Sequence, residues 1–79
     1  MRDLGTVISK LIDVIPADKE ELLHELMKVQ ISVRYAASEL MNMWWKRTHE
    51  ILCDHVFNKC FDENNWKGKV RRIYVGEEE

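Results

Sequence analysis

Proline and glycine are scarce in this sequence. One proline and three glycines occur in 79 residues, and none of them lies between residues 19 and 57. So little glycine excludes a glycine-rich loop of the kind that holds nucleotide phosphates, and the chain has no paired-carboxylate motif either. We therefore expect a protein that is not an enzyme and that carries no cofactor.

Cysteines and long apolar runs are also few. The two cysteines lack the dense spacing of a disulfide-stapled secreted domain. No apolar stretch approaches the roughly 18–20 residues that span a membrane. Ser9, Lys10 and Asp13 interrupt the first apolar segment, so we expect no signal peptide. These features predict a cytoplasmic protein without a membrane partner.

Charge of one sign is not in large excess. Twelve Lys and Arg residues are offset by 14 Asp and Glu residues, which gives a formal net charge of −2. This balance is unlike the basic domain of a dedicated nucleic-acid binder.

Apolar residues are abundant, at 46% of the sequence. A chain this short buries only about 60–65% of the surface that it exposes when unfolded. Small domains usually add a disulfide, a metal or a partner subunit to such a core. We expect a single domain over residues 1–79 that carries more apolar material than it can bury alone.

The first segment predicts a helix over residues 3–15. Asp3 can cap its start, and Pro16 ends it, because the residue before a proline is pushed out of the helical region. Asp18 and Glu21 then have the spacing of a capping box for a second helix. The apolar residues of the first helix recur at helical spacing: Leu4, Val7, Ile8, Leu11, Ile12 and Ile15.

Residues 18–57 predict one long helix. Neither glycine nor proline interrupts its body, and a helix of this length would extend for about 58 Å. The alternative is a break near residues 36–38, which would give two shorter helices. We favour the continuous helix, because alanine is the best helix former and nothing at Ala36, Ala37 or Ser38 demands a turn.

This long helix has two apolar faces, because its polar residues gather into a stripe only about 100° wide. One apolar line alternates in steps of four and three: Leu22, Leu26, Val29, Val33, Ala36, Leu40 and Met43. The second line is Leu23, Met27, Ile31, Met41, Trp45, Leu52 and Val56. The first helix can cover only part of these faces. We therefore expect a homo-oligomer, in the simplest case an antiparallel or four-helix dimer.

The C-terminal part has a different pattern. Residues 58–65 predict a polar loop. Residues 66–79 predict a short β-strand or an extended tail, because β-branched and aromatic residues cluster near its centre. The predicted fold is therefore mainly all-α, with a short helix and one long helix in an intersubunit bundle, followed by a short C-terminal β-strand or extended tail.

Three residues could hold a metal ion. His49 and Cys53 are four residues apart on the predicted helix, and Cys60 could fold back toward them. Their spacing matches no specific zinc arrangement, and free cysteines are commonly inert packing residues. We expect neither a bound metal nor a Cys–His nucleophile here.

A basic segment near the C-terminus is the best argument for a polyanion partner. Cations interleaved with aromatic rings suit phosphate contact and base stacking. The segment has only four positive charges, however, and such charges also protect an edge strand against aggregation. Nucleic acid therefore ranks below a protein partner. The residues concerned are Trp66, Lys67, Lys69, Arg71, Arg72 and Tyr74.

Two arginines fall on the apolar lines of the predicted helix. Arg34 lies on the second line and Arg47 on the first. A guanidinium in apolar surroundings needs a carboxylate, a carbonyl, an aromatic face or a ligand anion. The side chain could extend to the rim of the apolar face, or an intersubunit ion pair with Glu39, Asp13 or Asp54 would supply such a partner. So would an anionic ligand such as a nucleotide, on whose base Tyr35 or Trp45 could stack.

The adjacent residues Trp44 and Trp45 form the densest aromatic cluster. Neighbouring residues on a helix point about 100° apart, so one ring can fill the core while the other meets a partner.

We predict a non-catalytic helical homo-oligomer that binds a partner macromolecule as a regulator, inhibitor or adaptor. Phage-encoded accessory and anti-defence proteins are often of this size. The alternative is a module that sequesters a small anion at the subunit interface, and the third is nucleic-acid binding.

Overall fold

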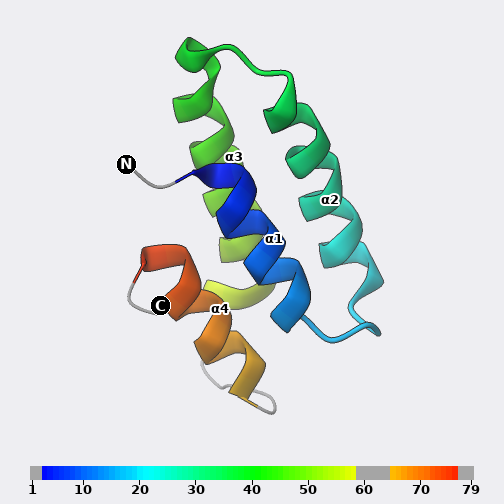
Figure 1. The fold of residues 1–79 in the computed structure, drawn as a ribbon. Coiled ribbons are helices and arrows are strands. Elements are labelled where there is room, and N and C mark those ends of the chain that lie inside the picture. The colour runs from blue at the N-terminus through cyan, green and yellow to red at the C-terminus, as the bar shows by residue number, and fades with distance from the viewer. Residues whose placement is uncertain (1–2, 59–64, 77–79) are drawn as a thin grey trace.

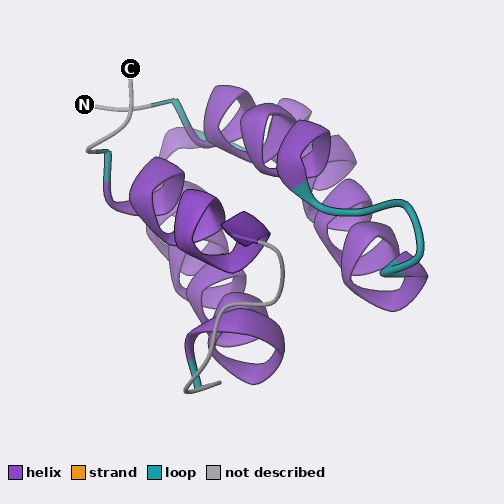
Figure 2. Cartoon of the chain, turned by 90° about the horizontal axis from the view of Figure 1, so that it is seen from below, coloured by secondary structure: helices purple, strands orange, loops and turns teal. Residues whose placement is uncertain are grey.

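Every element in the described part of the chain is helical, as the mainly α-helical prediction requires. The computed structural model describes residues 3–58 and 65–76. Most of the loop predicted over residues 58–65 therefore lies outside the described residues, as do the terminal glutamates, residues 77–79. Figure 2 shows helices and short connections, with no strand among the described residues. The elements are α1 (Leu4–Val14), α2 (Glu20–Arg34), the 3₁₀ turn η1 (Ser38–Leu40), α3 (Met41–Leu52), the π-helical turn η2 (Cys53–Phe57) and α4 (Trp66–Val75).

The two ends of α1 form as the sequence predicts. The carboxylate of Asp3 accepts a hydrogen bond from the backbone N–H of Gly5 at 3.2 Å and another from the hydroxyl of Thr6 at 2.8 Å. This satisfies one N–H group that the helix itself cannot pair. Ile15 has an extended backbone, with φ −69° and ψ 131°, as the following Pro16 demands.

The predicted start of α2 is wrong in detail. The residue at its N-cap is Lys19, which makes no side-chain capping hydrogen bond, so Asp18 and Glu21 do not form a capping box. Glu20 and Glu21 occupy the first turn instead. There their negative charge stabilises the helix by opposing the positive end of its dipole.

The prediction of one continuous helix over residues 18–57 is also wrong. The chain leaves the helical conformation after Arg34, and Ala37 is extended with φ −72° and ψ 161°. The break coincides with the alternative predicted near residues 36–38. Helices α2 and α3 therefore run in opposite directions as a hairpin (Figure 1). Because the chain folds back, both helices bury one face in a common core. The free energy gained from this burial outweighs the preference of the alanines for a continuous helix.

The C-terminal segment differs from its prediction as well, since residues 66–75 form α4 and not a strand. The buried side chains of Trp66, Val70 and Ile73 follow one another at intervals of four and three residues, as one helix face requires. Gly76 ends the helix with φ 87°, and its N–H donates to the carbonyl of Arg72 at 3.0 Å. Glycine adopts this left-handed conformation without strain.

A single core lies between the helices. Helix α1 packs against α2 and α4, and α2 packs against α3 (Figure 1). None of the described helices is both long and apolar enough to cross a membrane. The apolar side chains with no exposed surface come from every α-helix and from η2: Leu4, Ile8, Leu11, Leu26, Leu52, Val56 and Val70.

Leu26→Ala is expected to lower the free energy of unfolding by about 3 kcal/mol, because it removes a fully buried side chain and leaves a cavity. Urea unfolding followed by circular dichroism measures the loss. Lys28→Ala changes an exposed residue of the same helix and is the matched control, with an expected change below about 0.5 kcal/mol. Equal losses in the two variants would contradict this placement of the core.

Candidate protein-binding surface

The side of α2 that faces away from the core carries two large exposed apolar side chains. Met27 and Ile31, one helical turn apart, are 49% and 58% exposed. The four buried residues of α2 lie on its other side. Leu23, which is partly buried, precedes Met27 by one turn. We call Glu20, Leu23, Met27, Ile31 and Arg34 the outer face of α2.

The two ends of the outer face carry opposite charges. Glu20 begins α2 and Arg34 ends it, and both side chains are exposed. Neither makes a hydrogen bond or an ion pair with another described residue. Arg34 also lines a surface hollow of about 490 Å³ together with Ser9 and Gln30. The described part of the chain thus leaves the charge of Arg34 available to another molecule.

A second apolar area lies at the turn between α2 and α3. Tyr35 is 86% exposed, Met43 is 51% exposed and Leu40 is 40% exposed. We call these three residues the hairpin end. Among the described residues, the large exposed apolar side chains are concentrated here and on the outer face of α2, with Val75 on α4 as the exception.

Arg47 lies apart from Arg34 and has partners of its own. Its guanidinium nitrogens are 3.7 Å from a carboxylate oxygen of Glu25 and 3.6 Å from one of Glu50. With Trp44 it lines a separate cavity of about 210 Å³ between α2 and α3. The structure therefore does not bring the two arginines together into one anion site within a single chain.

The adjacent tryptophans pack on different neighbours. The indole N–H of Trp44 is buried, with no hydrogen-bond partner among the described residues. Trp45 packs on the ring of Tyr74 at a centroid distance of 5.7 Å, and its carbonyl accepts a hydrogen bond from the Tyr74 hydroxyl at 3.2 Å. Both tryptophans are partly buried, so neither belongs to the large exposed apolar side chains of the outer face of α2 and the hairpin end.

The basic segment forms α4 with its aromatic residues packed inward. Trp66 is 6% exposed, and Tyr74 packs against α3. Lys67 is also only 6% exposed, with its ammonium 5.7 Å from the centre of the Trp66 ring. Base stacking needs exposed aromatic faces, so the folded segment suits nucleic acid less than its sequence suggested. Three cations of the segment remain exposed: Lys69, Arg71 and Arg72.

His49 and Cys53 lie side by side, with Nε2 and Sγ 3.3 Å apart. The third predicted ligand, Cys60, lies outside the described residues. The His49 ring also stacks on Tyr74 and contacts Phe57, each at a centroid distance of 5.7 Å. The described residues therefore place two donor atoms at this point, whereas a structural zinc site has four.

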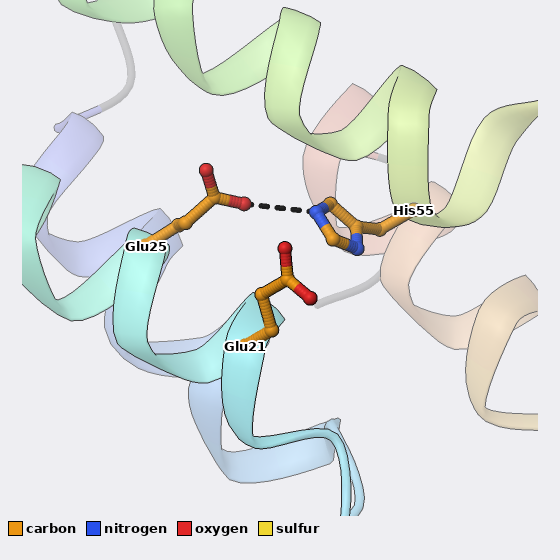
Figure 3. A group of neighbouring side chains, drawn as sticks. All are labelled: Glu21, Glu25 and His55. Carbon is orange, nitrogen blue, oxygen red and sulfur yellow. Dashed lines mark hydrogen bonds and ion pairs between the residues drawn. The ribbon is translucent and has the colours of Figure 1, made fainter.

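One polar group that the sequence analysis missed joins α2 to η2. Glu21, Glu25 and His55 each place a ligand atom within 4.8 Å of the others (Figure 3). Carboxylates and imidazoles are zinc ligands, so these residues could hold a divalent ion. The spacing of Glu21 and Glu25, four residues apart on one helix, is visible in the sequence. The approach of His55 is not visible there, because it follows from the turn between α2 and α3.

The observed geometry of this group is a hydrogen bond and an ion pair that share the carboxylate of Glu25. Nε2 of His55 lies 2.8 Å from one carboxylate oxygen of Glu25, and Arg47 lies 3.7 Å from the other. Glu21 is exposed to solvent. Because Glu25 already has a hydrogen-bond partner and a cationic partner within the chain, we interpret the group as a structural link between α2 and η2.

Comparisons with protein-family models, with curated proteins and with solved structures find no match to this chain. Any inference about function therefore rests on the chain's own residues.

A double-mutant cycle tests the link between Glu25 and His55. Each change to alanine is expected to lower the free energy of unfolding by about 1 kcal/mol, with a coupling energy of similar size, because both remove the same partly buried hydrogen bond. Asp54→Ala, at an exposed position of η2, is the matched control and should change the free energy by less than about 0.5 kcal/mol. A coupling energy near zero would contradict the link.

Proposed function

We propose that this chain is a non-catalytic helical protein that associates with copies of itself and binds another macromolecule, as a regulator, inhibitor or adaptor. The observation that carries the proposal is the concentration of exposed apolar side chains on the outer face of α2 and at the hairpin end. Large exposed apolar patches are rare on soluble monomers and commonly mark interaction sites.

The two apolar areas suit two different partners. The outer face is a straight stripe along one helix, which is the shape that helices present when they pack side by side. At the hairpin end, by contrast, an aromatic ring at the end of α2 and a methionine in the first turn of α3 are both exposed. Both residue types are enriched at the centres of protein interfaces, and methionine adapts to irregular surfaces. We assign the outer face to self-association and the hairpin end to the second macromolecule.

Light scattering tests self-association. The purified protein is expected to have twice the chain mass of 9.4 kDa, and Met27→Asp is expected to reduce it to a monomer, because a carboxylate in an apolar contact loses its hydration without a partner. Lys46→Asp, at an exposed position of α3, is the matched control and should remain a dimer. A mass of 9.4 kDa for the unchanged chain at all concentrations would contradict self-association.

Affinity capture from the native cell tests the hairpin end. The unchanged protein is expected to retain a protein of which a Tyr35→Asp/Met43→Asp variant retains about tenfold less, because buried carboxylates weaken an apolar contact. A Lys10→Asp/Lys69→Asp variant, with both changes at exposed positions on α1 and α4, is the control and should retain as much as the unchanged chain. Equal retention by all three proteins would contradict the assignment.

A second candidate function is the binding of a small anion at Arg34. The hollow beside this residue is also lined by the hydroxyl-bearing residues Thr6, Ser9 and Ser38, and an available guanidinium near hydroxyls suits a phosphate. Asp3 lines the same hollow and opposes an anion, so we rank this function second. A melting temperature raised by phosphate or a nucleotide, and no longer raised in Arg34→Met, would support it. No rise at millimolar ligand would exclude it.

A further inference from the structure

We infer that the outer face of α2 binds a second copy of this chain, with the two α2 helices antiparallel and Met27 at the two-fold axis. The inference rests on the self-association part of the proposed function and names its surface and pairing. Three features of the outer face support it: the spacing of its residues, the placement of its charges and its position in the fold.

The residues of the outer face are spaced symmetrically about Met27. From Glu20 to Arg34, the successive intervals are three, four, four and three residues. A two-fold axis at Met27 brings together residues that are equally distant from it on opposite sides. Ile31 then lies level with Leu23 of the partner subunit. A dimer interface with two-fold symmetry requires this kind of self-complementarity.

The charges select the antiparallel direction. Glu20 and Arg34 are each seven residues from Met27, so the two-fold axis places Arg34 of each copy beside the partner's Glu20. Both residues are exposed, and neither is paired with another described residue. A parallel pair would place Arg34 beside the partner's Arg34 and Glu20 beside the partner's Glu20, and such like-charge contacts are unfavourable.

The fold leaves most of the outer face accessible: Glu20, Met27, Ile31 and Arg34 are exposed, and Leu23 is partly buried. Helix α2 lies at one side of the molecule, with α1 and α3 packed on its other sides (Figure 1). Its 15 residues extend for about 22 Å, which accommodates four turns of side-by-side helix contact. A second copy can therefore approach without displacing any described element.

A second copy suits this face better than a protein of different sequence. The outer face has an apolar centre between one acidic and one basic end, and the matching surface would need the same features in reverse order. An antiparallel copy of α2 supplies that order. We therefore assign the outer face to self-association and leave the hairpin end for the other macromolecule.

Charge reversal tests the pairing of Glu20 with Arg34. Either Glu20→Arg or Arg34→Glu alone is expected to raise the dimer Kd about tenfold, because both symmetry-related pairs become like-charged. The double variant restores opposite charges and should return the Kd to within about threefold of the original. Sedimentation equilibrium measures these constants. Lys46→Glu is the matched control and should leave the Kd unchanged.

Cysteine cross-linking locates the axis, in a background with both native cysteines replaced by serine. Met27→Cys is expected to form a disulfide-linked dimer on mild oxidation, because residues at the contact line of packed helices come within the Cα separation of about 5.5 Å that a disulfide needs. Ile31→Cys is expected to cross-link when mixed with Leu23→Cys, and less well alone. Lys28→Cys, beside the contact line, is the control.

The outcomes separate this inference from the proposed function. A dimer whose affinity the double charge reversal does not restore, or one that cross-links through Lys28→Cys and not through Met27→Cys, would overturn the antiparallel pairing and leave self-association standing. A protein that is monomeric at every concentration would overturn both. Neither result would affect capture through the hairpin end, which is measured with the outer face unchanged.

Discussion

The architecture depends on the reversal of the chain between Arg34 and Ser38. Without it, the apolar residues of α3 would extend away from α1 and would have nothing in their own chain to cover them. With it, Ile51 and Leu52 join the same core as Leu26. The reversal also brings η2 back alongside α2, where His55 meets Glu25. Because α1 and α3 then occupy two sides of α2, no described element covers its remaining side, the outer face.

The sequence predicts those parts of the fold that local chemistry determines. Helix α1 begins and ends where Asp3 and Pro16 indicate, since capping and the proline restriction act over one or two residues. The reversal after Arg34 could not be predicted in the same way, because burial in a shared core decides it against local propensity. Helix α4 could have been predicted, because the helical spacing of its apolar residues and the glycine that ends it, Gly76, are both visible in the sequence. The β-branched residues near its end led to the prediction of a strand instead.

The same division applies to the candidate site. The sequence predicts that Leu23, Met27 and Ile31 share one apolar line, because helical spacing within α2 fixes their direction. In the structure Met27 and Ile31 are exposed, whereas Leu23 is partly buried against the core. The later residues of that line lie in α3 and η2, and the reversal of the chain packs them against the core. Met41 and Trp45 are partly buried, and Leu52 and Val56 have no exposed surface. The contact between Glu25 and His55 joins residues 30 positions apart, and no local pattern indicates it. The sequence therefore predicts which residues share a face of one helix. It does not predict contacts between residues of different helices, because these depend on how the helices pack.

The charges at the ends of the outer face suit both the single chain and the inferred dimer. Within one α2, Glu20 lies at the positive end of the helix dipole and Arg34 at the negative end, so each stabilises the helix. In an antiparallel pair, each helix start lies beside the partner's helix end, and dipoles and side chains attract across the contact. Each of these charges would lose part of its hydration in the dimer, but each would gain an opposite charge from the partner subunit in return. The part of the outer face that is unfavourable in a lone chain is thus its apolar centre, and in the inferred dimer the burial of Met27 and Ile31 would supply the driving force.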